Sequence, residues 1–156
     1  MLAEIVRQDD DWLEITHDYI QWLFPLAEHS RVTPGAPILL PTDIQAFRSD
    51  SLLRNHVLVA FRRMLSFFGL TFANARVTKS STWQQRRGNW FTESTHNNLR
   101  ITRILKSLML LGLEAEAHAF HACLRELCAT ESECAVPAES QAFWVQAVSS
   151  SKASGA

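Results

Sequence analysis

The chain has 156 residues, of which 47% are hydrophobic and 20% are charged, and its net charge is −1. This length suits one domain that buries about two-thirds of the surface of its unfolded chain, and the composition is that of an ordinary globular protein. The longest uninterrupted apolar run, Leu108–Leu113, is far shorter than the roughly 20 residues needed to span a membrane. The acidic N-terminus lacks the basic region and apolar run of a signal peptide.

Three cysteines, Cys123, Cys128 and Cys134, lie close together near the end of the chain. An odd number in one cluster does not indicate a disulfide framework. A reducing, intracellular compartment is the simplest inference. We therefore expect a soluble cytoplasmic protein.

The small net charge conceals an uneven distribution along the chain. Residues 1–50 carry a net charge of −6, residues 51–106 a net charge of +9, and residues 107–156 a net charge of −4. One interpretation is that acidic and basic segments pair with each other in the fold. The other is a basic patch that binds a carboxylate, a phosphate or a nucleic acid.

The first predicted helix ends at a proline. Trp12, Ile15 and Tyr19 recur at helical spacing, and Pro25 cannot lie inside a helix, so this helix should end around Phe24. A proline-rich loop follows over residues 26–41. Similar periodicity predicts further helices over residues 42–47, 50–68, 80–90, 113–129 and 138–148. Residues 71–79 alternate only weakly and do not indicate a definite strand.

The clearest pattern predicts a central helix over residues 96–111. Apolar residues recur there at spacings of three and four and share one wide face: Ile101, Ile104, Leu105, Leu108 and Leu111. Thr92, Ser94 and Thr95 offer N-cap hydroxyls just upstream, and Gly112 can adopt the left-handed conformation that ends a helix. A polar seam runs beside the apolar face and consists of His96, Arg100, Arg103 and Ser107, with Lys106 at its edge. Such a helix is either a central strut or the wall of a groove.

These elements predict an all-α fold, with about five to six helices packed around the central helix in a single compact domain. The domain should extend over residues 1–148. Residues 149–156 are a small-residue tail that we expect to be disordered.

Several blocks of the sequence resemble the conserved N-terminal region of the opioid growth factor receptor family. Tyr19–Leu26 and His96–Leu108 are similar to that family's signature and occur in the same order. Between them, Val59–Leu70 resembles the family's long middle helix, and Trp83–Arg87 resembles its aromatic-Gln-basic-basic run. The resemblance covers nearly the whole chain, from residue 12 to residue 148.

This resemblance implies an intracellular helical domain, here of the stand-alone bacterial or fungal type. The family is named for a receptor that binds an opioid pentapeptide and restrains cell growth, and it is unlike the membrane-spanning opioid receptors. Its members can be nuclear or membrane-associated. The vertebrate members carry long extensions and repeats after this domain, whereas this sequence continues for only eight residues.

An aromatic and basic cluster is the candidate ligand-binding site. Arginine stacks on aromatic rings and forms bidentate pairs with carboxylates and phosphates. The predicted groove is lined by Trp22, Trp83, Arg86, Arg87, Trp90, Arg100 and Arg103. The alternative is structural, with the tryptophans anchored in the core and the arginines solvated or paired with the acidic residues of the first fifty.

Gln21 and Asn97 form a second candidate, a structural polar clamp. Gln21 lies in an apolar run, where a buried amide needs hydrogen-bond partners. Asn97 lies on the core-facing side of the central helix and is a possible partner. The alternative is that Gln21 orients a ligand.

The sequence gives no support for a metal, a cofactor or a catalytic centre. His118, His121 and Cys123 lie on one predicted helix but lack an HExxH pattern, and the cysteines lack paired CxxC spacing. There is no glycine-rich phosphate loop and no GxSxG motif. We therefore expect a non-enzymatic module that binds a short peptide or a protein partner. The alternative is a nucleic-acid-binding domain that uses the basic face of residues 76–106. The sequence leaves the oligomeric state open.

Overall fold

The computed structural model describes residues 1–149. Across these residues the chain forms nine α-helices, one 3-10 helix and one two-stranded hairpin. The elements are α1 (Leu2–Ile5), α2 (Asp10–Ile15), α3 (Ile20–Leu23), α4 (Pro41–Ser49), α5 (Ser51–Phe67), β1 (Leu70–Ala73), β2 (Arg76–Lys79), α6 (Trp83–Arg86), η1 (Arg87–Asn89), α7 (His96–Leu110), α8 (Glu114–Thr130) and α9 (Ala138–Ser149). The predicted all-α single domain is confirmed in its helical character, with more helices over the described residues than the five to six expected and with one small hairpin.

Helix α7 is the predicted central helix, and its ends follow from local sequence. The backbone N–H of Asn97 donates to Oγ1 of Thr95 at 3.2 Å, which caps the N-terminus. Gly112 has a φ of +87° just beyond the C-terminus, where glycine adopts the left-handed conformation without steric cost. The predicted apolar face of α7 is fully buried. These observations confirm the predicted central helix.

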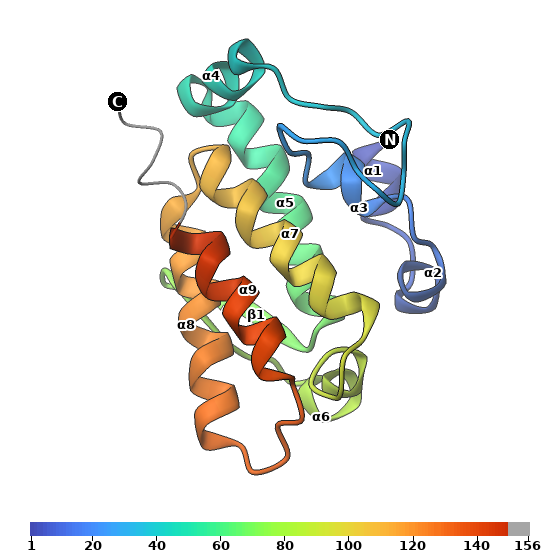
Figure 1. Cartoon of the computed structure of the whole chain (residues 1–156), viewed down its shortest axis with the longest axis vertical. Helices are drawn as coiled ribbons and strands as arrows, with labels where there is room; N and C mark the ends of the chain where they lie inside the picture. Colours follow the sequence, from blue (N-terminus) through green and yellow to red (C-terminus); the bar gives the residue numbers. More distant parts are fainter. Residues whose placement is uncertain (150–156) are drawn as a thin grey trace.

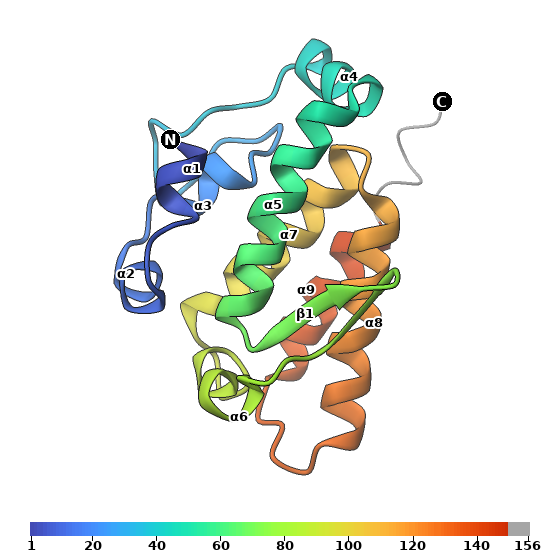
Figure 2. The same ribbon diagram turned by 180° about the vertical axis from the view of Figure 1, so that it is seen from behind.

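The other elements surround α7. Helices α8 and α9 pack against it, and α1, α2 and α3 lie on the side of α7 that faces away from α8 (Figure 1). The hairpin contacts α5 through β1 and α8 through β2 (Figure 2). This arrangement leaves one flank of α7 facing the N-terminal segment. Of the helices that the structure describes, none combines the length and the apolar character needed to cross a membrane.

The first predicted helix, over residues 12–24, is wrong in its continuity, because the chain forms α2 and α3 with a break between them. At the break, the guanidinium of Arg100 donates to the carbonyl oxygens of Leu13 at 2.8 Å and Thr16 at 2.7 Å. The Tyr19 hydroxyl also donates to the Leu13 carbonyl, at 3.0 Å. Side chains from elsewhere thus satisfy carbonyls that a continuous helix would pair internally.

Residues 70–79 form the hairpin, which the weak alternation of the sequence did not define. Its turn residues Asn74 and Ala75 have φ values of +53° and +58°, as the primed turns that suit strand twist require. Phe72 pairs with Val77, whose side chain is buried. Asn-Ala is a weaker turn signal than Asn-Gly, so burial against α5 and α8 decides the structure here.

Helix α9 confirms the predicted helix over residues 138–148. Helix α9 continues to Ser149, whose hydroxyl donates to the Val145 carbonyl at 2.7 Å. The remainder of the predicted tail, residues 150–156, lies outside the described residues.

Candidate functional site

The polar seam of α7 holds the N-terminal segment in place. Besides the two bonds from Arg100, Nε of Arg103 donates to the Phe24 carbonyl at 2.8 Å, and Oγ of Ser107 donates to the Pro25 carbonyl at 2.9 Å. Successive turns of α7 therefore bind backbone carbonyls in α2 and just after α2 and α3. The seam is a structural strut along this part of its length.

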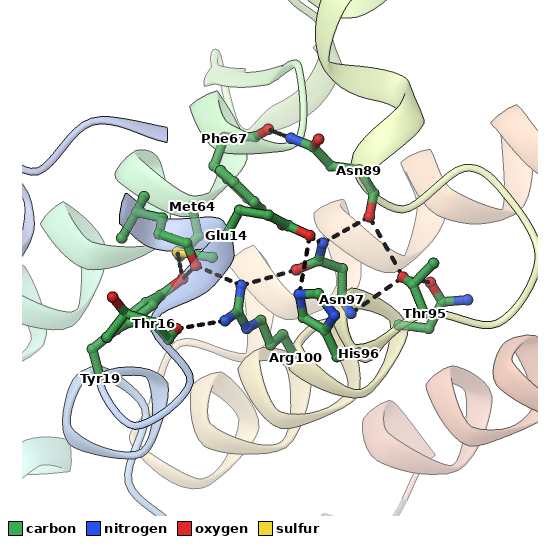
Figure 3. A network of polar contacts seen from close by, with 12 residues as sticks. Glu14, Thr16, Tyr19, Met64, Phe67, Asn89, Thr95, His96, Asn97 and Arg100 are labelled. Carbon is green, nitrogen blue, oxygen red and sulfur yellow. Dashed lines mark hydrogen bonds and ion pairs between the residues drawn. The ribbon is translucent and has the colours of Figure 1, made fainter. Parts of the chain in front are cut away.

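A network of polar contacts surrounds Asn97 at the start of the seam (Figure 3). The Asn97 amide donates to Oε2 of Glu14 at 2.9 Å and to the Asn89 carbonyl at 2.7 Å, and its oxygen accepts from Arg100 at 3.1 Å. Glu14 also lies beside His96, with 3.2 Å between Oε1 and Nε2. The predicted clamp between Gln21 and Asn97 is wrong, because these neighbours already use the Asn97 amide.

Burial controls the electrostatics of this network. Burial raises the pKa of Tyr19 to about 12, and the positive charge of Arg100 partly offsets this effect. Burial also lowers the pKa of Arg100, against the influence of Tyr19 and Glu14. The pKa of His96 lies below its ordinary value, mainly because of burial, although the Glu14 carboxylate opposes that shift. The network therefore contains a neutral phenol and a histidine that resists protonation.

Trp83 and Trp90 lie in the core, with exposed fractions of 4% and 0%. Their ring centroids are 5.9 Å apart, and the indole N–H of Trp90 donates to the Phe68 carbonyl at 2.9 Å. Trp22, in contrast, is 43% exposed and lines a separate apolar hollow beside α1. The structure therefore does not bring the three tryptophans into the predicted groove, because the large apolar surfaces of two of them are buried instead.

Arg86 and Arg87 also lie away from the seam, and both pair with acidic residues. Arg86 is 2.9 Å from Asp10, which also binds Arg63 at 2.7 Å. Arg87 pairs with Glu133. Further pairs join the acidic ends of the chain to its basic middle: Glu14–His96, Glu28–Lys106 and Glu131–Lys79. These pairs favour the first interpretation of the charge distribution, in which acidic and basic segments pair with each other in the fold.

A groove of about 720 Å³ does lie along α7, between this helix and the loop that follows α3. His96, Arg100 and Arg103 of the seam line one side of it. A second hollow of about 580 Å³ adjoins the groove and shares four lining residues with it: Leu26, Glu28, Lys106 and Phe143. At this boundary, Nζ of Lys106 is 3.4 Å from Oε1 of Glu28. The ion pair thus lies between the groove and the second hollow.

The groove contains polar groups without protein partners. Gln21 lines it and is only 5% exposed, yet its Oε1 accepts no hydrogen bond. Arg103 is partly buried, and within residues 1–149 its two terminal nitrogens donate to no protein atom. Exposed apolar side chains of Val32, Leu99 and Phe143 border these groups. A buried acceptor and a free guanidinium beside apolar surface are suited to a ligand with both polar and apolar parts.

The sequence indicated Gln21, Arg100 and Arg103 as candidates, but it did not indicate the loop residues that face them. Glu28, His29 and Arg31 line the groove from residues 26–32, and Phe143 approaches from α9. The available signal was the presence of charged residues in a proline-punctuated loop. That signal could not show which helix the loop covers.

Comparisons with known proteins show which family the chain belongs to. The family model described as the opioid growth factor receptor conserved region matches residues 2–154. The mouse opioid growth factor receptor is 43% identical over 111 residues, which are 69% of this chain and 17% of the relative. The human receptor is 41% identical over 107 residues, which are 67% of this chain and 16% of the relative.

A second group of relatives gives the same result. The opioid growth factor receptor-like protein 1 of Xenopus tropicalis is 42% identical over 110 residues, which are 69% of this chain and 21% of the relative. This chain thus spans about a fifth of the length of these curated relatives. No solved structure matches it. The chain belongs to the family of the opioid growth factor receptor conserved region.

Proposed function

We propose that this domain is a non-enzymatic module that binds a short peptide in the groove along α7. The observation that carries the proposal is the buried, unpartnered Oε1 of Gln21 in the groove wall. Burying an acceptor without a partner costs free energy. A peptide N–H placed at this oxygen would recover that cost, so the groove is built to favour a ligand that carries hydrogen-bond donors.

The dimensions of the groove match a pentapeptide. Its α7 lining extends from His96 to Lys106, a distance of about 15 Å at a rise of about 1.5 Å per residue. Five residues in extended conformation measure about 16 Å. The relatives are named receptors for an opioid growth factor, and an opioid pentapeptide is therefore the first ligand to test.

The chemistry of the groove also suits a peptide. Val32, Leu99 and Phe143 present apolar surface that aromatic and aliphatic side chains can cover. Arg31 and Arg103 provide positive charge for a carboxylate. A protein partner would bind through the same groove if it presented such a segment in extended form.

Calorimetric titration of the domain with an opioid pentapeptide tests the proposal. We expect saturable binding to the parent domain and an affinity about tenfold lower for Gln21→Met, because this variant loses one hydrogen bond. Gln21→Met should keep or increase thermal stability, because it removes a buried unpartnered acceptor. Gln45→Met on α4 is the matched control, because Gln45 is exposed and does not line the groove, and it should bind like the parent. Absence of binding to the parent, or equal binding by Gln21→Met, would contradict the proposal.

A short DNA duplex titrated at low and high salt tests the alternative function. On duplex DNA, the logarithm of the binding constant falls with the logarithm of salt concentration by about 0.9 per phosphate contacted. Binding through one carboxylate should depend only mildly on salt. Steep salt dependence with the duplex, and no binding of the peptide, would favour nucleic-acid binding by residues 76–106.

A further inference from the structure

We propose that Arg103 makes the groove selective for peptides that end in a free C-terminal carboxylate. This inference rests on the proposed peptide-binding function and adds the chemical class of the ligand and the end of the groove that receives its C-terminus.

The guanidinium of Arg103 is fixed on one side and free on the other. Its Nε donates to the Phe24 carbonyl at 2.8 Å, which holds the plane of the group against the N-terminal segment. Its two terminal nitrogens have no hydrogen-bond or ion-pair partner among residues 1–149, and the side chain lines the groove. A planar pair of free N–H donors matches the two oxygens of a carboxylate. The fixed plane reduces the entropy lost on binding.

The other cations of α7 are already used. Arg100 donates through both terminal nitrogens to the carbonyls of Leu13 and Thr16. Lys106 pairs with Glu28. Among the cations that α7 contributes to the groove, Arg103 is thus the one within the described structure whose charged end has no protein acceptor.

The position of Arg103 favours a terminal carboxylate over one inside a peptide. Arg103 lies one helical turn before Lys106, whose ion pair with Glu28 lies at the boundary between the groove and the second hollow. A peptide bound with its N-terminus toward His96 would place its C-terminus near Arg103 and this boundary. Burial lowers the pKa of Arg103, and the nearby negative charge of Glu28 opposes that shift. The same charge would repel a multiply charged anion more than a single carboxylate.

The first experiment compares two forms of an opioid pentapeptide on the parent domain by calorimetry. One form has a free C-terminal carboxylate and the other a C-terminal amide. We expect the amide to bind about 10- to 100-fold more weakly, because a hydrogen-bonded contact to a charged group is lost. Equal affinities would overturn this inference and leave peptide binding intact, whereas no binding of either form would overturn the proposed function itself.

A third peptide identifies which carboxylate is recognised. It has a C-terminal amide and an aspartate side chain at its last position. If this peptide binds as tightly as the free acid, the groove binds carboxylates without regard to the chain terminus, and selectivity for the terminus is wrong. If it binds as weakly as the simple amide, the terminal position is recognised as proposed.

Two variants test whether Arg103 causes the preference for the free acid over the amide. Arg103→Gln should bind the acid and the amide with similar affinities, and Arg103→Lys should retain only part of the preference because it keeps the charge without the planar pair of donors. Arg125→Gln is the matched control, since Arg125 is exposed on α8 and does not line the groove, and it should preserve the preference. An undiminished preference for the acid in Arg103→Gln would overturn the assignment. If Arg103→Gln fails to fold, Arg103→Lys and the peptide comparison on the parent decide the question.

Discussion

Arg100 illustrates how a charged residue in a basic seam can belong to the framework. Its side chain is only 5% exposed, and its guanidinium lies 5.1 Å from the centre of the Tyr19 ring. It also bonds to Asn97 and to the carbonyls of Leu13 and Thr16. Its type and its spacing in the sequence alone predicted a role in ligand binding. Two of its partners are backbone carbonyls more than eighty residues away in the sequence.

The first prediction follows from these bonds. Arg100→Met should lower the free energy of unfolding by about 3 kcal/mol, because the Thr16 carbonyl and the Asn97 amide oxygen lose their donor and each unpaired buried group costs about 1–3 kcal/mol. The Leu13 carbonyl loses one donor but keeps the Tyr19 hydroxyl. Urea denaturation measures this change. Arg125→Met, an exposed substitution on α8, should remain within about 0.5 kcal/mol of the parent. Similar stabilities for the two variants would mean that the Arg100 bonds contribute little.

At the scale of elements, Gly69 joins α5 to the hairpin and allows α6 to approach closely. Its φ is +78°, and a Cβ atom there would lie 2.9 Å from Cα of Trp83 and 3.0 Å from Cβ of Arg86. Both the left-handed backbone and the close contact with another backbone atom require glycine. The sequence predicted that the preceding helix ends at residue 68, and the structure adds that α6 packs on the glycine that follows.

The second prediction concerns this junction. Gly69→Ala should destabilise the domain by about 2 kcal/mol or more, from backbone strain and from displacement of α6. The melting temperature should fall by about 5 °C or more, which thermal unfolding measures. Gly88→Ala provides the comparison, because a Cβ there meets no atom within 4 Å and its backbone is not left-handed. We expect a change of about 0.5 kcal/mol or less for Gly88→Ala, and an equal effect of both substitutions would contradict this account.

At the scale of the whole molecule, two histidines link stability to pH, the buried His121 and the partly buried His96. Burial lowers the pKa of His96 and of His121 below the ordinary value of 6.5, and the charge of Arg125 adds to the shift of His121. The unfolded chain therefore binds more protons than the folded one as the pH falls through about 6.5. Stability must then decrease toward acid pH and rise toward neutral pH.

The third prediction tests this linkage. The parent should unfold at a lower urea concentration at pH 5.5 than at pH 7.5. His96→Gln and His121→Gln should each reduce the difference between the two pH values, and the double variant should reduce it further, because each substitution removes one group that the unfolded chain protonates. Denaturation curves at both pH values provide the measurement. A pH difference as large in the double variant as in the parent would exclude these histidines as its source.

The sequence by itself determined the features that depend on neighbouring residues. Apolar spacing and Gly112 define α7 and its C-terminal end, a run of hydroxyl side chains before residue 96 indicates its N-terminal end, and contiguous motifs identify the family. Tertiary structure decided which charges are paired, which tryptophans are buried and which polar groups in the groove lack partners. Arg100 and Arg103 are equivalent in the periodic pattern, yet one is saturated by backbone carbonyls and the other keeps free donors. The difference arises from contacts between residues that are distant in the chain, which no local pattern contains.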